Sequence, residues 1–184
     1  MSIRIYGNRE LKTLPGLETR PTPARVRQAL FNVWQGSISG CRWLDLCSGS
    51  GAMGAEALCR AAQLVVGIER SAAAGDIIEH NWRKVASESQ QFQLLRGDII
   101  KRLVELEGQQ FDRIYFDPPY AAGLYQPVLV AIDRFQLLAA LGELAVEHSP
   151  DPTISALPVN LLTLKLCRQK SYGNTSISFY SNSL

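Results

Sequence analysis

From about residue 42 onward, short apolar runs alternate along the chain with longer segments whose apolar positions follow a helical period. Runs of this length predict buried strands, and the 3.6-residue period predicts helices. The predicted strands are 42–47, 64–69, 92–95, 111–116, 144–147, 161–167 and 176–180. The predicted helices are 50–62, 72–85, 99–106, 125–133 and 135–141, and a proline-containing loop is expected at 151–158.

Strands separated by helix-length segments predict an α/β fold with right-handed crossovers, in which a mainly parallel sheet is covered by helices on both faces. The last two predicted strands have no helix between them, so we expect them to form an antiparallel pair at the C-terminal end.

The N-terminal segment 1–20 has little periodicity, and Gly7, Pro15 and Gly16 interrupt it, which favours an extended arm or a short hairpin. Residues 21–184 are expected to form a single domain. Its first helix is predicted at 22–34, because the apolar residues there share one helical face. Thr22 is expected to be the N-cap of this helix and Pro23 its first helical residue.

A length of 184 residues is enough for one domain with a substantial core. No apolar run approaches the roughly 20 residues that span a bilayer, and the N-terminus lacks the apolar segment of a signal peptide. A cytoplasmic monomer is therefore expected. The four cysteines form no C-x-x-C pair, and only two histidines are present, so we expect reduced, buried thiols and no metal site.

The net charge of +2 is unevenly distributed along the chain. Residues 1–42 carry seven Lys/Arg and two acids, whereas residues 43–184 carry twelve Lys/Arg and fifteen acids. A basic N-terminal part on a slightly acidic body suits a phosphate-rich partner such as a nucleic acid. A solvated surface segment is the alternative interpretation.

The tetrapeptide Asp117-Pro118-Pro119-Tyr120 directly follows the apolar run 111–116. Each proline fixes φ and removes a backbone N–H, so this turn at a strand end is stiff and its carbonyls are expected to point outward. A carboxylate and a carbonyl can accept hydrogen bonds from an exocyclic amine, while the tyrosine stacks on a flat ring. The segment therefore predicts a site for chemistry on the amino group of a base.

A glycine-rich turn joins the first sheet strand to an Ala-rich helix through Gly49, Ser50 and Gly51. Glycines allow a sharp turn and close approach of a ligand, and the helix N-terminus offers unpaired N–H groups. Glu69 ends the next strand and is placed to accept hydrogen bonds from a ribose diol. The pattern G-S-G-A-M-G also matches the dinucleotide signature, so the turn alone leaves an NAD site open.

Two further acids favour S-adenosylmethionine over a dinucleotide. Asp45 precedes the glycines, where a carboxylate would repel a pyrophosphate but suit the ammonium of a methionine-like group. Asp98 follows the third strand and could accept from an adenine amino group, or could cap the helix that begins at residue 99. Acids at the ends of four successive strands thus predict a site for this methyl donor.

The motifs together resemble those of the bacterial 16S rRNA guanine-N2 methyltransferases, a class I S-adenosylmethionine-dependent family. They are R-P-T-x-x-R-V-R-x-A-L-F-N at 20–32, L-D-L-x-x-G-S-G-x-x-G-x-E-A-L at 44–58, D-P-P-Y at 117–120, V-E-H-S at 146–149 and Y-G-N-T-x-I-x-F-Y at 172–180. They occur in the family's order and cover most of the chain. Cys47 and Ser48 depart from the family, which often has an aromatic and a small residue there.

The resemblance implies a Rossmann-like fold of about seven strands, with S-adenosylmethionine as donor and 16S rRNA, within a small ribosomal subunit or an assembly intermediate, as partner. It implies that Asp117 and the Pro118 carbonyl receive the target amine and that Tyr120 stacks on the base.

The basic residues near the N-terminus are candidates for contacts to either ligand. Thr22 and Arg25 could reach the donor's carboxylate or order the Pro-Pro turn, and Arg20 and Arg27 could contact RNA phosphate. Arg25 and Arg27 should lie on different helical faces. A purely solubilising surface role is the alternative for each arginine.

Two other functions stay open at this stage. A DNA adenine-N6 methyltransferase would share the catalytic elements, although this chain has no spare length for a separate target-recognition region. A non-catalytic RNA-binding or assembly protein could also use the same scaffold.

Overall fold

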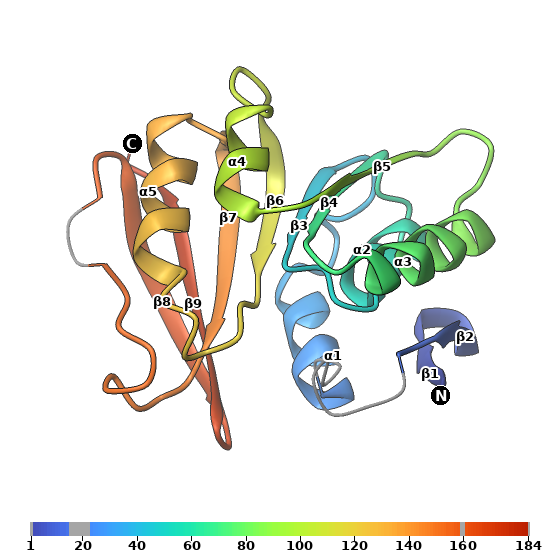
Figure 1. The fold of residues 1–184 in the computed structure, drawn as a ribbon, viewed down its shortest axis with the longest axis horizontal. Helices are drawn as coiled ribbons and strands as arrows, with labels where there is room; N and C mark the ends of the chain where they lie inside the picture. The colour runs from blue at the N-terminus through green and yellow to red at the C-terminus, as the bar shows by residue number, and fades with distance from the viewer. Residues whose placement is uncertain (1, 15–22, 159–160, 184) are drawn as a thin grey trace.

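The computed structural model describes residues 2–14, 23–158 and 161–183 (Figure 1). The elements, in chain order, are β1 (Ser2–Ile5), the 3-10 turn η1 (Tyr6–Asn8), β2 (Arg9–Lys12), α1 (Ala24–Val33), β3 (Arg42–Leu46), α2 (Ala52–Cys59), β4 (Leu64–Glu69), α3 (Ala72–Val85), β5 (Gln91–Arg96), α4 (Ile99–Val104), β6 (Phe111–Phe116), α5 (Tyr125–Arg134), β7 (Leu138–His148), β8 (Leu164–Tyr172) and β9 (Thr175–Asn182).

A seven-stranded sheet in the order β5-β4-β3-β6-β7-β9-β8 forms the centre of the protein. Strands β3 to β7 are parallel, and β9 runs antiparallel to both β7 and β8. The predicted α/β fold, with its mainly parallel sheet and antiparallel C-terminal pair, is confirmed. Parallel strands place their carboxyl ends at one edge of the sheet, which is where ligands bind in such folds.

The predicted helix at 135–141 is wrong. Phe135 is the C-cap of α5, Gln136 has a left-handed φ of +50°, and a strand begins at Leu138. The Leu- and Ala-rich sequence favours a helix locally, but Leu138 pairs with Phe111 of β6 instead. The side-chain amide of Asn182 also donates to two carbonyls of this segment. Tertiary pairing has overridden local propensity here.

Two helix starts also differ from expectation. Pro23 is the N-cap of α1 and not its first helical residue, so the helix begins one residue later than predicted, at Ala24. Thr22, the predicted N-cap, lies outside the described residues. Helix α2 begins at Ala52 because Gly51, at φ +72°, is left-handed and cannot continue a helix toward its N-terminus. The predicted start at residue 50 was therefore two residues early.

Two hydrophobic clusters cover the two faces of the sheet. On one face, α1, α2 and α3 pack against side chains that include Trp43 of β3, and on the other α4 and α5 pack against its neighbour Leu44. Successive strand residues point to opposite faces, so this alternation assigns each side of a strand to one cluster. The three tryptophans, Trp34, Trp43 and Trp82, are all buried and pack within this core.

The described part of the N-terminal segment forms an antiparallel hairpin, with Ile5 of β1 opposite Arg9 of β2. Figure 1 shows it beside the end of the molecule that holds α1 and α3. Ile5 and Leu11 are buried in the same cluster as α1, α2 and α3. The hairpin is therefore attached to the body through apolar contacts.

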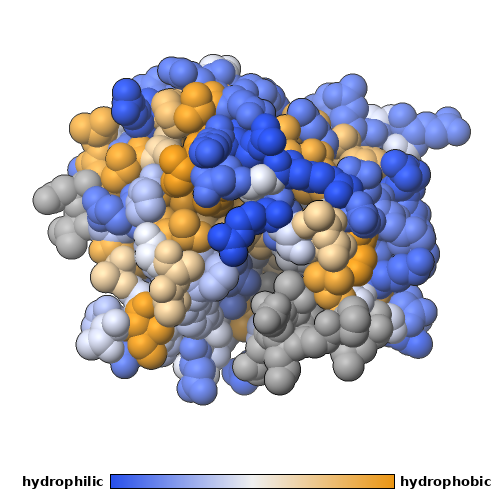
Figure 2. Space-filling model, in the orientation of Figure 1, coloured by the Kyte–Doolittle hydropathy of each residue, from blue (hydrophilic) through white to orange (hydrophobic). Residues whose placement is uncertain are grey.

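Surface character differs between the two sides of the molecule. In the view of Figure 2, hydrophobic surface gathers mainly on the side of α4 and α5, whereas the side of α3 is mostly hydrophilic. Val104 of α4 and Val130 of α5 are among the exposed large hydrophobic side chains. Within the described ranges, none of the helices is both long and apolar enough to cross a bilayer.

Candidate active site

The carboxyl ends of four adjacent parallel strands bring the predicted acidic residues into one row. Because the sheet order is β5-β4-β3-β6, the row runs Asp98, Glu69, Asp45, Asp117. The backbone N–H of Asp117 donates to the carbonyl of Leu46 at 3.4 Å, which joins the end of β6 to the end of β3. The glycine turn and the D-P-P-Y segment therefore lie next to each other, as the sequence predicted.

The turn between β3 and α2 has an unusual backbone. Gly49 has φ +56° and Gly51 φ +72°, values that glycine adopts at little cost. Cys47 has φ +61° although it carries a side chain. A Cβ built on Gly49 would meet nothing closer than 4.0 Å, so this position is open on the side that a ligand would approach.

Glu69 holds the ends of two loops together. Its carboxylate accepts hydrogen bonds from the backbone N–H of Gly49 at 2.9 Å and from that of Ser71 at 2.8 Å. The side chain is half-buried at the end of β4. Both contacts fix the carboxylate at the end of β4, beside the glycine turn.

Asp45 lies beneath the glycine turn, where it is only 1 % exposed. Its Oδ2 accepts a hydrogen bond from the backbone N–H of Gly54 at 3.1 Å, in the first turn of α2. Burial raises the pKa of Asp45 to about 8, and the nearby Glu69 carboxylate acts in the same direction. The carboxyl group therefore fixes the start of α2, a role that the sequence did not indicate.

Asp98 is the N-cap of α4. Its side chain accepts from the backbone N–H of Lys101 at 3.2 Å, which confirms the capping alternative. The residue is exposed at the end of β5, next to the end of β4, where the backbone N–H of Gly97 donates to the carbonyl of Glu69 at 2.9 Å. Its position thus leaves it available to a ligand along the same edge.

The D-P-P-Y turn has Asp117 half-buried, Pro118 buried and Pro119 exposed. The carbonyl of Pro119 accepts from the backbone N–H of Ala122 at 2.9 Å. The Pro119 carbonyl, expected to point outward, is therefore engaged within the turn, because the chain turns back after Tyr120. The carbonyl named for the target amine is the preceding one, that of Pro118.

Tyr120 is half-buried, and its hydroxyl points back into the protein. The hydroxyl lies 3.2 Å from Thr175 Oγ1 and donates to Glu147 Oε1 at 3.4 Å. Burial raises the pKa of Tyr120 to about 12, so the phenol is protonated at neutral pH. The ring packs against the cluster on the α4–α5 face.

Glu147 at the end of β7 was not among the predicted site residues. It is 3 % exposed, and its Oε2 accepts from the Tyr115 hydroxyl at 2.5 Å. Burial raises its pKa, whereas the hydrogen bonds from Tyr115 and Tyr120 oppose that shift. A glutamate directly after the apolar residues Leu144, Ala145 and Val146 was the signal that could have identified it.

Cys47 also lies between the two halves of the site. Burial raises the pKa of its thiol, and the carboxylates of Glu69, Asp117 and Asp45 add to the shift. The thiol is therefore a neutral, weakly polar group among three acids. The expectation that the cysteines are buried holds for Cys41, whereas Cys47 and Cys59 are half-buried and Cys167 is exposed.

Of the predicted arginines, Arg25 is exposed and Arg27 is buried at 3 % exposure, which confirms that they lie on different faces of α1. Arg27 Nε donates to Glu56 Oε2 at 2.7 Å, and its Nη2 donates to the carbonyl of Arg4 at 2.7 Å. The prediction that Arg27 contacts RNA is corrected, because its side chain is buried and two of its guanidinium nitrogens hold the hairpin to α2. Arg20 and Thr22 lie outside the described residues.

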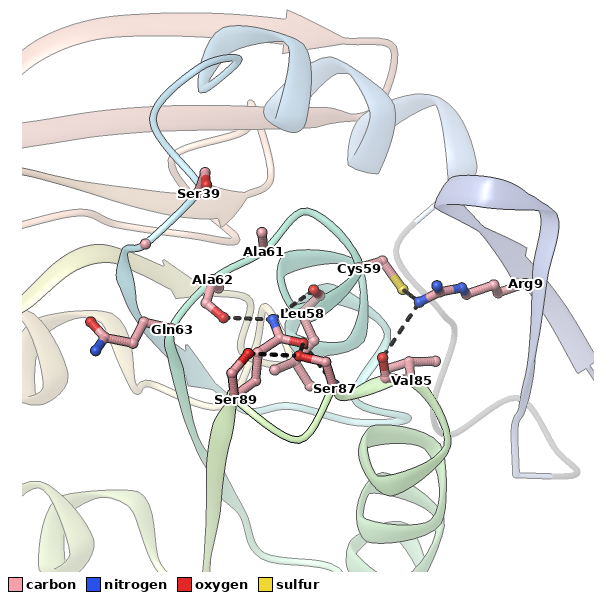
Figure 3. Close-up of a pocket in the computed structure, with 12 residues that line it drawn as sticks. Arg9, Ser39, Leu58, Cys59, Ala61, Ala62, Gln63, Val85, Ser87 and Ser89 are labelled. Atoms are coloured by element: carbon pink, nitrogen blue, oxygen red, sulfur yellow. Dashed lines mark hydrogen bonds between the residues drawn. The ribbon is translucent and has the colours of Figure 1, made fainter.

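A hollow of about 490 Å³ lies away from this edge, at the amino ends of β4 and β5 (Figure 3). Arg9 enters it from the hairpin and donates to Cys59 Sγ at 3.1 Å. None of the predicted site residues that the structure describes lines this hollow. No group of His, Cys, Asp and Glu that could hold a metal ion occurs among the described residues.

Comparison with known proteins places the chain in a family. The family model described as conserved hypothetical protein 95 matches residues 3–181. The “Putative rRNA methyltransferase YlbH” of Bacillus subtilis is 31 % identical over 174 residues, which cover 94 % of this chain and 92 % of that protein. The ribosomal RNA small subunit methyltransferase D of Escherichia coli K12 is 28 % identical, over 90 % of this chain and 80 % of that protein.

A solved structure, the “Putative methyltransferase yhhF from Escherichia coli”, superimposes with a TM-score of 0.82 at 29 % identity, over 99 % of this chain and 98 % of that one. The family model, these relatives and the shared fold agree with the resemblance drawn from the motifs. Because the family model matches residues 3–181, the chain belongs to the conserved hypothetical protein 95 family.

Proposed function

We propose that this protein methylates the exocyclic N2 amine of a guanine in small-subunit (16S) ribosomal RNA, with S-adenosylmethionine as the methyl donor. The observation that carries the proposal is the junction of the D-P-P-Y turn with the glycine turn, made by the hydrogen bond from Asp117 N–H to the Leu46 carbonyl. The names of the relatives YlbH and methyltransferase D support rRNA as the substrate class.

The residues at the strand ends fit the donor. Glu69 is oriented by two backbone N–H groups toward the position of a ribose diol, and Gly49 leaves open space in front of the turn. Asp98 is exposed at the position proposed for the adenine amine. The cationic donor suits an edge that carries several carboxylates, whereas a pyrophosphate would be repelled. When bound, the donor supplies an electrophilic methyl group on sulfur.

The acceptor half is formed by the D-P-P-Y turn. The lone pair of the guanine amine is delocalised into the ring, which makes the amine a weak nucleophile. Asp117 and the Pro118 carbonyl accept its two N–H bonds, favour a pyramidal nitrogen and aim its lone pair at the donor. Positioning of this kind provides a large part of the acceleration, and hydrogen bonds to a carboxylate are stronger than neutral ones.

The target base has to leave its stack to reach the turn. Stacking on an aromatic side chain is worth about 1–3 kcal/mol per base, so the Tyr120 ring offsets part of the unstacking cost. The substrate RNA approaches the site edge of the sheet. Arg25 is exposed at the start of α1 and remains a candidate for a phosphate or donor-carboxylate contact, whereas the enclosed Arg27 is not.

Methyl transfer from tritiated S-adenosylmethionine tests the proposal on four substrates: unmethylated 16S rRNA, the assembled small subunit, duplex DNA and unrelated RNA. We expect labelled N2-methylguanosine after nuclease digestion of one of the first two. Label on adenine in DNA, or no transfer to any substrate while the donor still binds, would replace the proposal with one of the two alternatives.

The variant Asp117→Ala is expected to retain donor binding by calorimetry and to lose most turnover. Asp112→Ala is the matched control, because Asp112 lies on β6 at the opposite edge and accepts from the backbone N–H of Arg42 at 2.7 Å. This control should lower stability without a comparable effect on the turnover of folded protein. Loss of donor binding in step with turnover in Asp117→Ala would contradict the assigned role.

A further inference from the structure

Three tyrosine hydroxyls converge on Glu147, which lies outside the donor and amine contacts described above. Tyr115 of β6 and Tyr120 of the D-P-P-Y turn donate to its two carboxylate oxygens, and Tyr125 of α5 donates to its backbone carbonyl at 3.2 Å. The carboxylate thus connects the catalytic turn with two neighbouring strands, β6 and β7. In the described part of the chain, no Lys or Arg forms an ion pair with it.

A buried carboxylate without a basic partner is expensive unless hydrogen bonds satisfy it. Both phenols donate to Glu147, so their protons point toward its carboxylate oxygens. The Tyr120 oxygen is then free to accept from Thr175 Oγ1 at 3.2 Å. A directed chain results, from Thr175 through Tyr120 to Glu147, and it fixes the far end of the Tyr120 ring.

Through Thr175, this chain of hydrogen bonds is also attached to the β8–β9 hairpin. Thr175 is the first residue of β9, directly after the turn of the β8–β9 hairpin, and it pairs with Tyr172. In Figure 1 this hairpin extends beyond the end of β6 at the lower edge of the view. The Y-G-N-T segment found in the sequence therefore supplies one of the two groups that hold the Tyr120 hydroxyl.

We infer that Glu147 is a positioning residue for methyl transfer, which acts by holding Tyr120, together with Thr175, so that the ring presents a fixed face to the target base. This inference rests on the proposed function of the D-P-P-Y turn. Since misplacement by about 1 Å can cost on the order of a hundredfold in rate, a ring that is free to rotate would lower turnover even where donor binding is unchanged.

A double-mutant cycle in turnover separates positioning from a general structural role. Tyr120→Phe keeps the ring but removes the hydroxyl through which Glu147 acts. We expect Glu147→Gln to lower kcat about tenfold in the wild-type background and to add little in the Tyr120→Phe background. The affinity for the donor should stay unchanged in all variants. An equal loss in both backgrounds would overturn the inference.

Glu143→Gln is the control on the same strand. Glu143 accepts from Trp34 Nε1 at 2.7 Å and pairs with Arg168, so it too is a hydrogen-bonded glutamate of β7. This variant should lower the melting temperature without lowering kcat. Thr175→Val removes the other hydrogen bond to the Tyr120 hydroxyl, and Thr175 is only half-buried. This variant tests the inference if Glu147→Gln does not fold.

The order of the Tyr120 ring is measured independently of activity. In protein with ¹³C-labelled tyrosine rings, the Tyr120 signal should broaden or shift in Glu147→Gln and Thr175→Val but not in Glu143→Gln. If wild-type protein transferred no methyl group to RNA, the proposed function would fail while this measurement still decided whether Glu147 holds the ring. An unchanged Tyr120 signal in both variants would contradict the anchoring.

Discussion

The indole nitrogen of Trp82 donates a hydrogen bond to the carbonyl oxygen of Gly51 at 2.8 Å. A side chain of α3 thereby fixes the turn that precedes α2. The same indole lies against Gly54 and Gly67, where an added Cβ would come within 2.5 Å of the ring carbons. At Gly54 and Gly67 the packing of the buried tryptophan, and not a left-handed φ, thus requires glycine.

Gly54→Ala should destabilise the protein by about 1–3 kcal/mol, because the new methyl group overpacks a fully buried contact between Trp82 and Val65. Gly75→Ala is the control in α3. Its Cβ would meet only the flexible guanidinium of Arg96, so helix propensity should make it neutral or stabilising by up to about 1 kcal/mol. Urea unfolding of both variants checks the contrast, and equal effects would contradict the steric argument.

The sequence pattern was sufficient to predict the bounds of elements whose hydrophobic period was clear. The bounds of β4, α3 and β6 match the predicted 64–69, 72–85 and 111–116. The pattern failed at 135–141, where local composition favours a helix and strand pairing favours β7. Pairing partners far along the chain are absent from a local pattern, so the pattern predicted only the part of β7 at 144–147 and not its beginning at 138.

In the site, too, features that follow from the local order of elements were predicted, and contacts between distant residues were not. The row of strand-end acids follows from the strand–helix order, because parallel strands share one carboxyl edge. The contact between Arg27 and Glu56 joins residues 29 positions apart, and a charged residue in a basic segment was taken for a surface residue. Glu147 was missed because its partners, Tyr115 and Tyr120, lie on other elements.

Asn81, which is fully buried, links the N-terminal hairpin to the glycine turn. Its amide exchanges two hydrogen bonds with the backbone of Lys12, at 2.9 Å each, and donates to the carbonyl of Ser50 at 3.0 Å. Asn81→Ala leaves these backbone groups without partners. Each such group that water does not reach should lower the free energy of unfolding by about 1–3 kcal/mol. We expect lower stability and faster amide hydrogen exchange at Lys12.

Asn182→Ala is the control for this variant, because its side chain also donates to two backbone carbonyls, at 3.1 Å each, but contacts β7 and not the hairpin. It should lower stability without a selective increase in exchange along β2. Equal protection of Lys12 in Asn81→Ala and in wild-type protein would show that the hairpin is held by its apolar contacts alone.

Glu56 is a buried acid between two arginines. It is 2 % exposed and lies 2.7 Å from Arg27 Nε and 2.9 Å from Arg60 Nη2. Glu56→Ala leaves the buried Arg27 guanidinium without its counter-ion, and removing one partner of such a pair typically costs about 3–5 kcal/mol. Calorimetric unfolding should show this loss.

The exposed pair of Asp76 and Arg96, at 2.8 Å, provides the comparison for this buried cluster. The Asp76 side chain is 75 % exposed, and exposed pairs contribute about 0–1 kcal/mol. Asp76→Ala should therefore change the free energy of unfolding by less than about 1 kcal/mol. A Glu56→Ala effect as small as that of Asp76→Ala would mean that water or a rearranged Arg60 compensates the lost carboxylate.

The buried Asp45 should make stability depend on pH in the donor-free protein. Burial raises its pKa to about 8 in the folded state, whereas an unfolded aspartate titrates near 4. Between these values the folded protein holds a proton that the unfolded chain has released, so the free energy of unfolding should fall as pH rises, by up to about 1.4 kcal/mol per pH unit. Above about pH 8 both states are ionised and this slope should end.

Asp45→Asn resembles the protonated carboxyl and removes the titration. Its advantage in unfolding free energy over wild-type protein should therefore widen from about pH 4 to about pH 8, and urea unfolding of both proteins across this range measures it. Groups that do not interact with Asp45 titrate equally in the two proteins and cancel in the difference. A constant difference at all pH values would mean that Asp45 is ionised in the folded state throughout, with Gly54 N–H and the α2 terminus stabilising the charge.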